Sequence, residues 1–272
     1  MKKNDSPFCF IHIPKTGGVT LHSVLIDQYP FKKRMSFVAK HEAHKFYDLP
    51  DAEKATYKLL KGHIWFDAEK FSANKDTIFF TYLRQPIQRT ISHYYYLFQN
   101  PNHRLHKEMT ENNYSLKQLY NMGKVLNLDN CMVRFISGNC NKDWDTMNED
   151  DLALAIANFD KYFNHFGIQE YYDESLLILA NQLGWKSPFY SRLNEGNKKK
   201  KEPFDAETQQ MMIHFNRLDE KLYKHALDKF LLLKEEHKDM LAKQLPVFQK
   251  KNKGYWTLRA FVYPYLGSRV YR

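Results

Sequence analysis

A lysine and two threonines share a double-glycine turn near the start of the chain, in the run Pro14-Lys15-Thr16-Gly17-Gly18-Val19-Thr20. An ammonium group and hydroxyls in one turn supply charge-assisted and neutral hydrogen bonds, and glycines let the backbone approach a ligand. Phosphate and sulfate are the groups that such donors bind. Because Lys15 precedes the glycines, the Walker A order is absent and an ordinary P-loop NTPase is disfavoured. The alternative is a common glycine-rich turn with a surface lysine.

The sequence on either side of this turn predicts a strand before it and a helix after it. The apolar run Phe8–Ile13 is typical of a buried strand, and apolar residues from Val19 to Leu25 recur at helical spacing. The order is therefore strand, tight turn, helix. In that order several backbone N–H groups converge at the positive end of a helix dipole, which favours an anionic ligand.

A second motif lies in residues 77–98. Residues 77–83 form another strand-like run, Arg84 follows it directly, and Pro86 suits the first position of a helix. Arg84 is thus expected at the carboxyl end of a strand, where α/β sheets bind ligands. The Arg84 guanidinium and the Ser92 hydroxyl could close on one anion. Ser92 could instead be a small packing residue, and Arg89 is equally compatible with a solvated helix surface.

The two motifs together resemble the sulfotransferases that use 3′-phosphoadenosine 5′-phosphosulfate (PAPS), with the closest likeness to carbohydrate enzymes of the heparan sulfate 2-O-sulfotransferase type. The resemblance implies a P-loop-like α/β fold, with a central parallel sheet flanked by helices. It also implies that the first motif binds the 5′-phosphosulfate and the second the 3′-phosphate. The donor-binding residues are then Lys15, Thr16, Gly17, Gly18, Val19, Thr20, Arg84 and Ser92.

The same resemblance implies a catalytic histidine in the segment Lys61–Phe71. His63 follows a strand-like run, and a histidine is suited to removing a hydroxyl proton near neutral pH. Lys15 is expected to meet the negative charge that builds on the leaving group. Lys61 stands where the resembled enzymes have a second histidine, which leaves the acceptor open. His12 is expected to be a strand residue under the turn, near enough to be a rival base.

Two further stretches are predicted to contact ligands. A late basic loop covers the nucleotide in the resembled family, which implies Arg192 and Lys198 as donor contacts. Asn130 and Arg134 lie four residues apart and would share a helix face on the acceptor side. Lys61, Asn130 and Arg134 are therefore the predicted acceptor-binding residues. Arg134 could equally pair with an acidic neighbour in the fold.

Length and composition predict one α/β domain over residues 1–272, with a core at about 8–236 and a basic, aromatic extension at about 246–272. A helical insertion is expected at 99–150, a linking helix at about 42–56, and a long helix at about 205–236. We see no apolar stretch that could span a membrane and no signal core, so a cytoplasmic enzyme is expected. Three cysteines without metal-ligand spacing fit a reducing compartment and predict no metal site.

The predicted function is therefore transfer of a sulfuryl group from PAPS to an acceptor hydroxyl, with PAP as product and a glycan as the favoured acceptor. A small natural-product alcohol is the alternative acceptor. A nucleotide-dependent kinase and a non-catalytic anion-binding protein are the more distant alternatives, since the net charge of +10 attracts many anions. Nucleic acid is not an expected partner, because no recognition motif for it is present. A homo-oligomer stays open.

Overall fold

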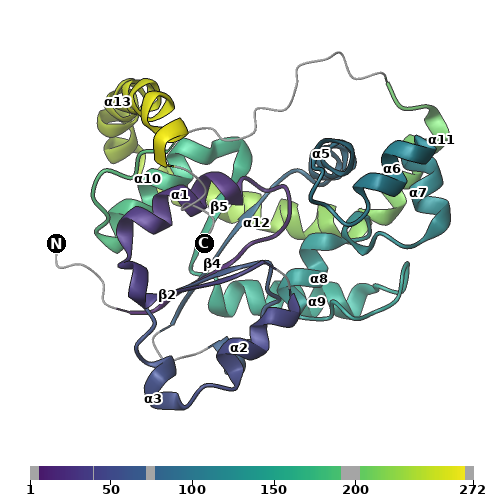
Figure 1. The fold of residues 1–272 in the computed structure, drawn as a ribbon, viewed down its shortest axis with the longest axis horizontal. Coiled ribbons are helices and arrows are strands. Elements are labelled where there is room, and N and C mark those ends of the chain that lie inside the picture. The colour runs from purple at the N-terminus through teal and green to yellow at the C-terminus, as the bar shows by residue number, and fades with distance from the viewer. Residues whose placement is uncertain (1–5, 39, 72–76, 191–202, 267–272) are drawn as a thin grey trace.

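A five-stranded parallel sheet forms the centre of the part of the chain that the structure describes, with helices on both faces (Figure 1). The structure is a computed structural model, and it describes residues 6–38, 40–71, 77–190 and 203–266. The strands are β1 (Phe8–Ile11), β2 (Arg34–Phe37), β3 (Leu59–Gly62), β4 (Ile78–Leu83) and β5 (His165–Ile168). The predicted α/β class with a central parallel sheet is thus confirmed.

The strand order β2-β3-β1-β4-β5 places β1 at the centre of the sheet. All four residues of β1 are buried, as expected of a strand covered by helices on both faces. After β1 the chain runs to one side of the sheet for β2 and β3, and then crosses to the other side for β4 and β5. The side of β1 on which successive strands are added therefore changes after β3. Ligands of open α/β sheets bind at such a switch point, beyond the carboxyl ends of the strands.

Three helices begin at this end of the sheet. They are α1 (Gly18–Gln28) after β1, α5 (Pro86–Gln99) after β4, and α10 (Tyr172–Leu183) after β5 and the short η4 (Gln169–Tyr171). Gln85 caps α5, because its side chain accepts a hydrogen bond from the Gln88 amide and Pro86 occupies the first turn. The helix starts thus surround the carboxyl ends of β1 and β4.

Two predicted helices are divided in the structure. The region at 42–56 holds only the short turns η2 (Lys40–Ala43), α2 (His44–Tyr47) and α3 (Asp51–Lys54), because Pro50 interrupts the helical backbone. The helix expected at 205–236 is α11 (Ala206–Phe215) and α12 (Arg217–Glu236), separated at Asn216. The buried Asn216 amide accepts from the Thr90 hydroxyl (3.0 Å) and donates to the Met212 carbonyl (2.9 Å), which fixes the break.

The predicted insertion at 99–150 is helical, with connecting loops. The remaining elements are η1 (Phe31–Lys33), α4 (Ala68–Phe71), α6 (His106–Asn112), α7 (Leu116–Met122), η3 (Leu126–Leu128), α8 (Cys131–Ser137) and α9 (Glu149–Tyr162). A second apolar cluster, which includes Leu97, Leu119 and Phe215, joins α5, α7 and α11 beside the main core.

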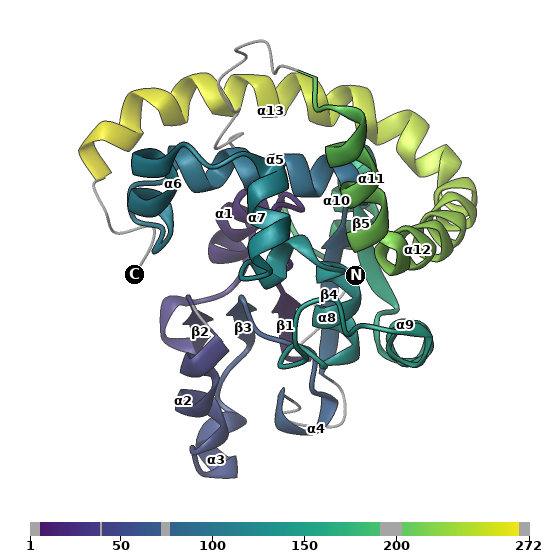
Figure 2. The same cartoon turned by 90° about the vertical axis from the view of Figure 1, so that its right-hand side faces the viewer.

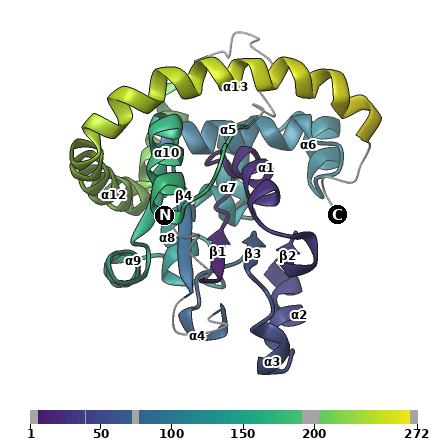
Figure 3. The same ribbon diagram turned by 90° about the vertical axis from the view of Figure 1, so that its left-hand side faces the viewer.

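The C-terminal helix α13 (Lys238–Leu266) curves along the end of the molecule toward which the strands point (Figures 2 and 3). It packs on α10, and its Leu241 and Phe248 are buried in the main core. No helix among the described residues is long and apolar enough to cross a membrane. The C-terminal helical region expected from the sequence is present, and it packs against the fold.

Candidate active site

A cleft of about 600 Å³ opens at the carboxyl ends of β1, β3 and β4. Its walls come from the turn after β1, the residue after β3, α5, the start of α10, and one residue of α13. The lining residues are His12, Pro14, Lys15, Gly17, Gly18, Val19, Thr20, His63, Arg84, Ser92, His93, Tyr96, Gln169, Glu170, Tyr172, Asp173, Glu174, Tyr190 and Gln249. The two sequence motifs and the predicted base therefore meet at one site.

The turn after β1 adopts a backbone that only some residues tolerate. Lys15 has φ 70° and Gly17 has φ 93°, so the chain twice enters the left-handed region. The Thr16 side chain is buried, and its hydroxyl donates to the Ile13 carbonyl oxygen (2.9 Å). Thr16 therefore holds the turn together. The prediction that its hydroxyl forms a hydrogen bond to the phosphosulfate is wrong.

Gly18 is required for a reason that the sequence did not suggest. A Cβ atom at this position would lie 2.1 Å from the ring of His12, so the glycine makes room for an imidazole. That ring stacks on His63 with 4.2 Å between ring centres. His12 lies under the turn, as expected, and the missing side chain of Gly18 lets it support His63.

The ammonium group of Lys15 is partly desolvated. Its Nζ lies over the Tyr96 ring, 4.2 Å from the ring centre, and its carbonyl oxygen accepts a hydrogen bond from Arg84 Nη1 (3.1 Å). Burial, with a smaller contribution from the Arg84 charge, lowers the pKa of Lys15 to about 8. A desolvated ammonium group interacts strongly with any anion that enters the cleft.

Arg84 and Ser92 line the cleft from the end of β4 and from α5, as the second motif predicts. The Arg84 Nε atom is buried and has no hydrogen-bond partner among the described residues. Buried guanidinium nitrogens are normally paired. The unpaired donor therefore fits an anionic ligand beside Ser92.

His63 is held in the form that a base requires. Its Nδ1 lies 2.8 Å from the His12 carbonyl oxygen, which can only accept, so Nδ1 carries the proton and Nε2 has a free lone pair. Burial is the main cause that lowers the pKa of His63 below its ordinary value, so the ring is neutral near pH 7. The preceding Gly62 has φ 152°, and a Cβ there would meet the Phe37 carbonyl oxygen at 2.0 Å. Gly62 thus permits the turn that leads from β3 to His63.

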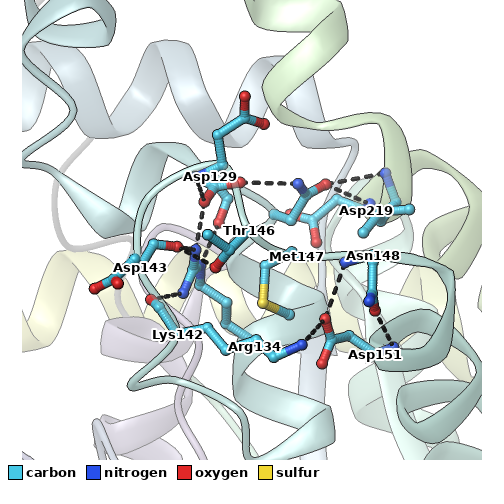
Figure 4. Close-up of polar contacts among 12 residues, drawn as sticks. Asp129, Arg134, Lys142, Asp143, Thr146, Met147, Asn148, Asp151 and Asp219 are labelled. Atoms are coloured by element: carbon cyan, nitrogen blue, oxygen red, sulfur yellow. Dashed lines mark hydrogen bonds and ion pairs between the residues drawn. The ribbon is translucent and has the colours of Figure 1, made fainter.

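The predicted acceptor-binding residues on α8 lie elsewhere. Arg134 is buried and forms an ion pair with Asp129, and its guanidinium also donates to the carbonyl oxygens of Lys142 (2.7 Å) and Asp143 (2.8 Å) (Figure 4). Asn130 Oδ1 accepts from the Leu218 amide (2.9 Å). The acceptor role predicted for both residues is wrong, because these side chains are used within the fold.

Lys61 is also buried, in the middle of the sheet between Phe10 and Ser36, and is not among the described residues that line the cleft. Burial, followed by the Arg34 charge, lowers its pKa to about 8. Its predicted contact with an acceptor stays a prediction. No lining residue comes from the described insertion at 99–150 either. Arg192 and Lys198 lie outside the described residues, so their predicted roles stay predictions.

Several lining residues were missed in the sequence. His93 and Tyr96 share the cleft-facing side of α5 with Ser92, so helical spacing from Ser92 could have found them. Tyr172 and Gln249 gave no such signal, because α10 and α13 approach the cleft only through the tertiary fold. In the described residues no cluster of histidine, cysteine or acidic side chains could hold a metal ion, and the absence of a metal stays a prediction.

Comparison with known proteins bears on the chemistry of this cleft. No curated protein matches the chain closely enough to count as a relative. The family model of the galactose-3-O-sulfotransferases matches residues 12–242, which include every lining residue except Gln249. The closer likeness to the heparan sulfate 2-O type stays a prediction. The chain belongs to the galactose-3-O-sulfotransferase family and is a sulfotransferase of the kind that modifies carbohydrates.

Proposed function

We propose that the protein transfers a sulfuryl group from PAPS to a hydroxyl of a galactose-containing glycan, with His63 as the base. The observation that carries the proposal is the meeting of Lys15, Arg84 and the unprotonated Nε2 of His63 in one cleft. The family match supports sulfuryl transfer to a sugar. The donor, the base and the particular acceptor are the parts proposed here.

The residues of the cleft fit the proposed donor. Arg84 offers an unpaired buried donor, Lys15 a desolvated ammonium group, and the turn after it places successive backbone amides at the start of α1. Lys15 and Gly17 to Thr20 would hold the 5′-phosphosulfate, and Arg84 with Ser92 the 3′-phosphate. When bound, PAPS supplies the sulfuryl group and a phosphate that leaves with the electron pair of the broken bond.

Two side chains have complementary roles in the proposed reaction, one at the leaving group and one at the attacking hydroxyl. The Lys15 ammonium group stabilises the negative charge that develops on the departing phosphate oxygen. His63 Nε2 accepts the proton of the attacking hydroxyl, while the bond from Nδ1 to the His12 carbonyl keeps the ring oriented. Because the stacked His12 lies beside it, His63 can turn little, and the lone pair stays directed.

A transfer assay with radiolabelled PAPS and a panel of acceptors tests the proposal. The panel contains a galactoside, a desulfated heparan fragment and a simple alcohol, and the modified position is read by NMR. We expect label on the galactoside, none with ATP as labelled donor, and none with Lys15→Ala enzyme. Label only on the heparan fragment or the simple alcohol would replace the proposed acceptor. No transfer to any acceptor would overturn the proposed activity.

A further inference from the structure

His93 is a buried imidazole in the cleft wall whose hydrogen-bonding groups are unused. It lies in α5 next to Ser92, is 2% exposed, and lines the cleft. Neither Nδ1 nor Nε2 has a hydrogen-bond partner among the described residues. Buried polar side chains are almost always paired, since an unpaired one loses its hydration without compensation. An imidazole with two unused nitrogens at a cleft therefore points to a ligand.

The groups around His93 do not supply these missing bonds. Arg89 is fully buried, and its Nη2 donates to the Asn127 carbonyl oxygen (2.8 Å) and the Thr90 hydroxyl (3.3 Å), while its Nε and Nη1 have no partner among the described residues. The rings of Tyr96 and His103 lie 6.2 Å and 6.4 Å away between centres. Burial, then the charge of Arg89, lowers the pKa of His93 well below its ordinary value, so the ring is neutral.

A neutral imidazole has one donor and one acceptor, and this decides the kind of ligand. A sulfate or phosphate oxygen can only accept, so it could pair only with the ring N–H. A hydroxyl both donates and accepts, so a sugar hydroxyl can pair with whichever ring nitrogen faces the cleft. His93 also lies close to the reacting end of the cleft, because Tyr96, three residues further along α5, lies under the Lys15 ammonium group.

We propose that His93 binds a hydroxyl of the acceptor next to the hydroxyl that receives the sulfuryl group. His93 is then a specificity-determining residue, which selects sugars with neighbouring hydroxyls over simple alcohols. The inference rests on the proposed transfer to a sugar, and it adds a contact that the two sequence motifs did not predict.

Kinetics with His93→Phe, His93→Gln and a set of deoxy-galactosides test this contact. In the wild type, removing the hydroxyl that His93 binds lowers kcat/KM for the acceptor roughly tenfold to a hundredfold. His93→Phe keeps a ring but no polar atoms. Its kcat/KM for the intact galactoside should therefore already be as low as that of the wild type for the deoxy sugar, and removing the hydroxyl should lower it no further. His93→Gln, which retains a donor and an acceptor, recovers part of the difference. His214→Phe, at a partly exposed histidine outside the cleft, should behave as wild type.

Each outcome separates this contact from the proposed activity. PAP affinity, measured by calorimetry, should be equal in wild type, His93→Phe and His93→Gln, which also shows that the variants are folded. If His93→Phe binds PAP normally and still distinguishes every deoxy sugar as the wild type does, the contact is absent and the inference is wrong. If the wild type transfers sulfuryl groups to no sugar, the proposed activity itself fails, and this inference falls with it.

Discussion

Around α8, the buried side chains of Asp129, Asn130, Arg134 and Asp219 hydrogen-bond to one another and to nearby backbone, whereas along the cleft Arg84, His93 and Tyr172 each keep a buried polar atom without a partner. In the α8 cluster, Asp219 accepts the amides of Met132 (3.0 Å) and Val133 (2.8 Å). Every buried side-chain nitrogen or oxygen of those four residues has a partner in the described structure.

We interpret the unpaired atoms along the cleft as groups that await a ligand, although buried unpaired atoms also occur among the described residues outside the cleft lining, as in His22 and Arg34. Both regions contain an arginine, buried at Arg134 and half-buried at Arg84, so the residue type alone does not distinguish the two regions. A satisfied network stabilises one packing arrangement, and removing a member leaves the others unpaired. An unsatisfied group at a cleft destabilises the empty protein and is compensated when a ligand binds. Substitutions in the two regions should therefore affect different measured quantities.

The largest effect is expected at the cleft, from His63→Ala. Without the base, kcat should fall by about 10²- to 10⁴-fold, while the melting temperature and PAP affinity stay near wild type. Steady-state kinetics, thermal melting and calorimetry measure the three quantities. His214→Ala is the control, since His214 pairs with Asp145 away from the cleft. Near-normal turnover of His63→Ala would transfer the role of base to another residue.

Arg134→Ala should lower the stability of the protein and leave ligand binding unchanged, the reverse of the effects expected for His63→Ala. Breaking its buried ion pair with Asp129 should cost about 3–5 kcal/mol of unfolding free energy, because the carboxylate stays buried without its partner. Denaturant unfolding measures this loss. The folded fraction should keep its PAP affinity and its acceptor KM. A stable variant with a raised acceptor KM would instead restore the acceptor role first predicted for Arg134.

The pH dependence of kcat/KM sharpens the account of the cleft. Lys15 acts in its charged form, so activity should fall about tenfold per pH unit above its pKa of about 8. His63 acts in its neutral form, and burial lowers its pKa, so the acid limb should lie below pH 6.5. Lys15→Arg should remove the alkaline limb, because arginine stays charged. Lys61→Met should keep it, although Lys61 has a similar pKa. Loss of the limb in Lys61→Met would contradict this assignment.

The smallest effects are expected where α13 meets the cleft wall. The Asn252 side chain accepts from the Tyr190 amide (2.8 Å), and the Gln249 side chain donates to Asp173 (3.0 Å). Asn252 is buried, so Asn252→Ala should lower the unfolding free energy by about 1–3 kcal/mol. The exposed Gln249 serves as the control, with a loss below about 1 kcal/mol. Equal effects would mean that burial at α13 does not matter.

Local patterns in the sequence predicted β1, β3 and β4, the turn after β1 and the positions of Arg84, Ser92 and His63. Those residues adjoin strongly periodic apolar runs, so neighbouring residues place them. The break at Asn216 was missed because it depends on Thr90, which is far away along the chain. For Arg134 the sequence left two alternatives open, and the structure shows the pairing with an acidic neighbour, Asp129, rather than the contact with an acceptor. The charge of a helix residue and its spacing do not reveal whether the fold already supplies its ion-pair or hydrogen-bond partner.

Calorimetric titration with PAP of the wild type and of Arg84→Ala tests most directly the claim that the unpaired groups of the cleft await the donor. ADP and ATP are the comparison ligands. We predict tight binding of PAP, weaker binding of ADP and ATP, which lack the 3′-phosphate, and a loss of PAP affinity of at least tenfold in Arg84→Ala with an unchanged melting temperature. Equal affinities for PAP and ADP in the wild type, or unchanged PAP affinity in Arg84→Ala, would contradict the account.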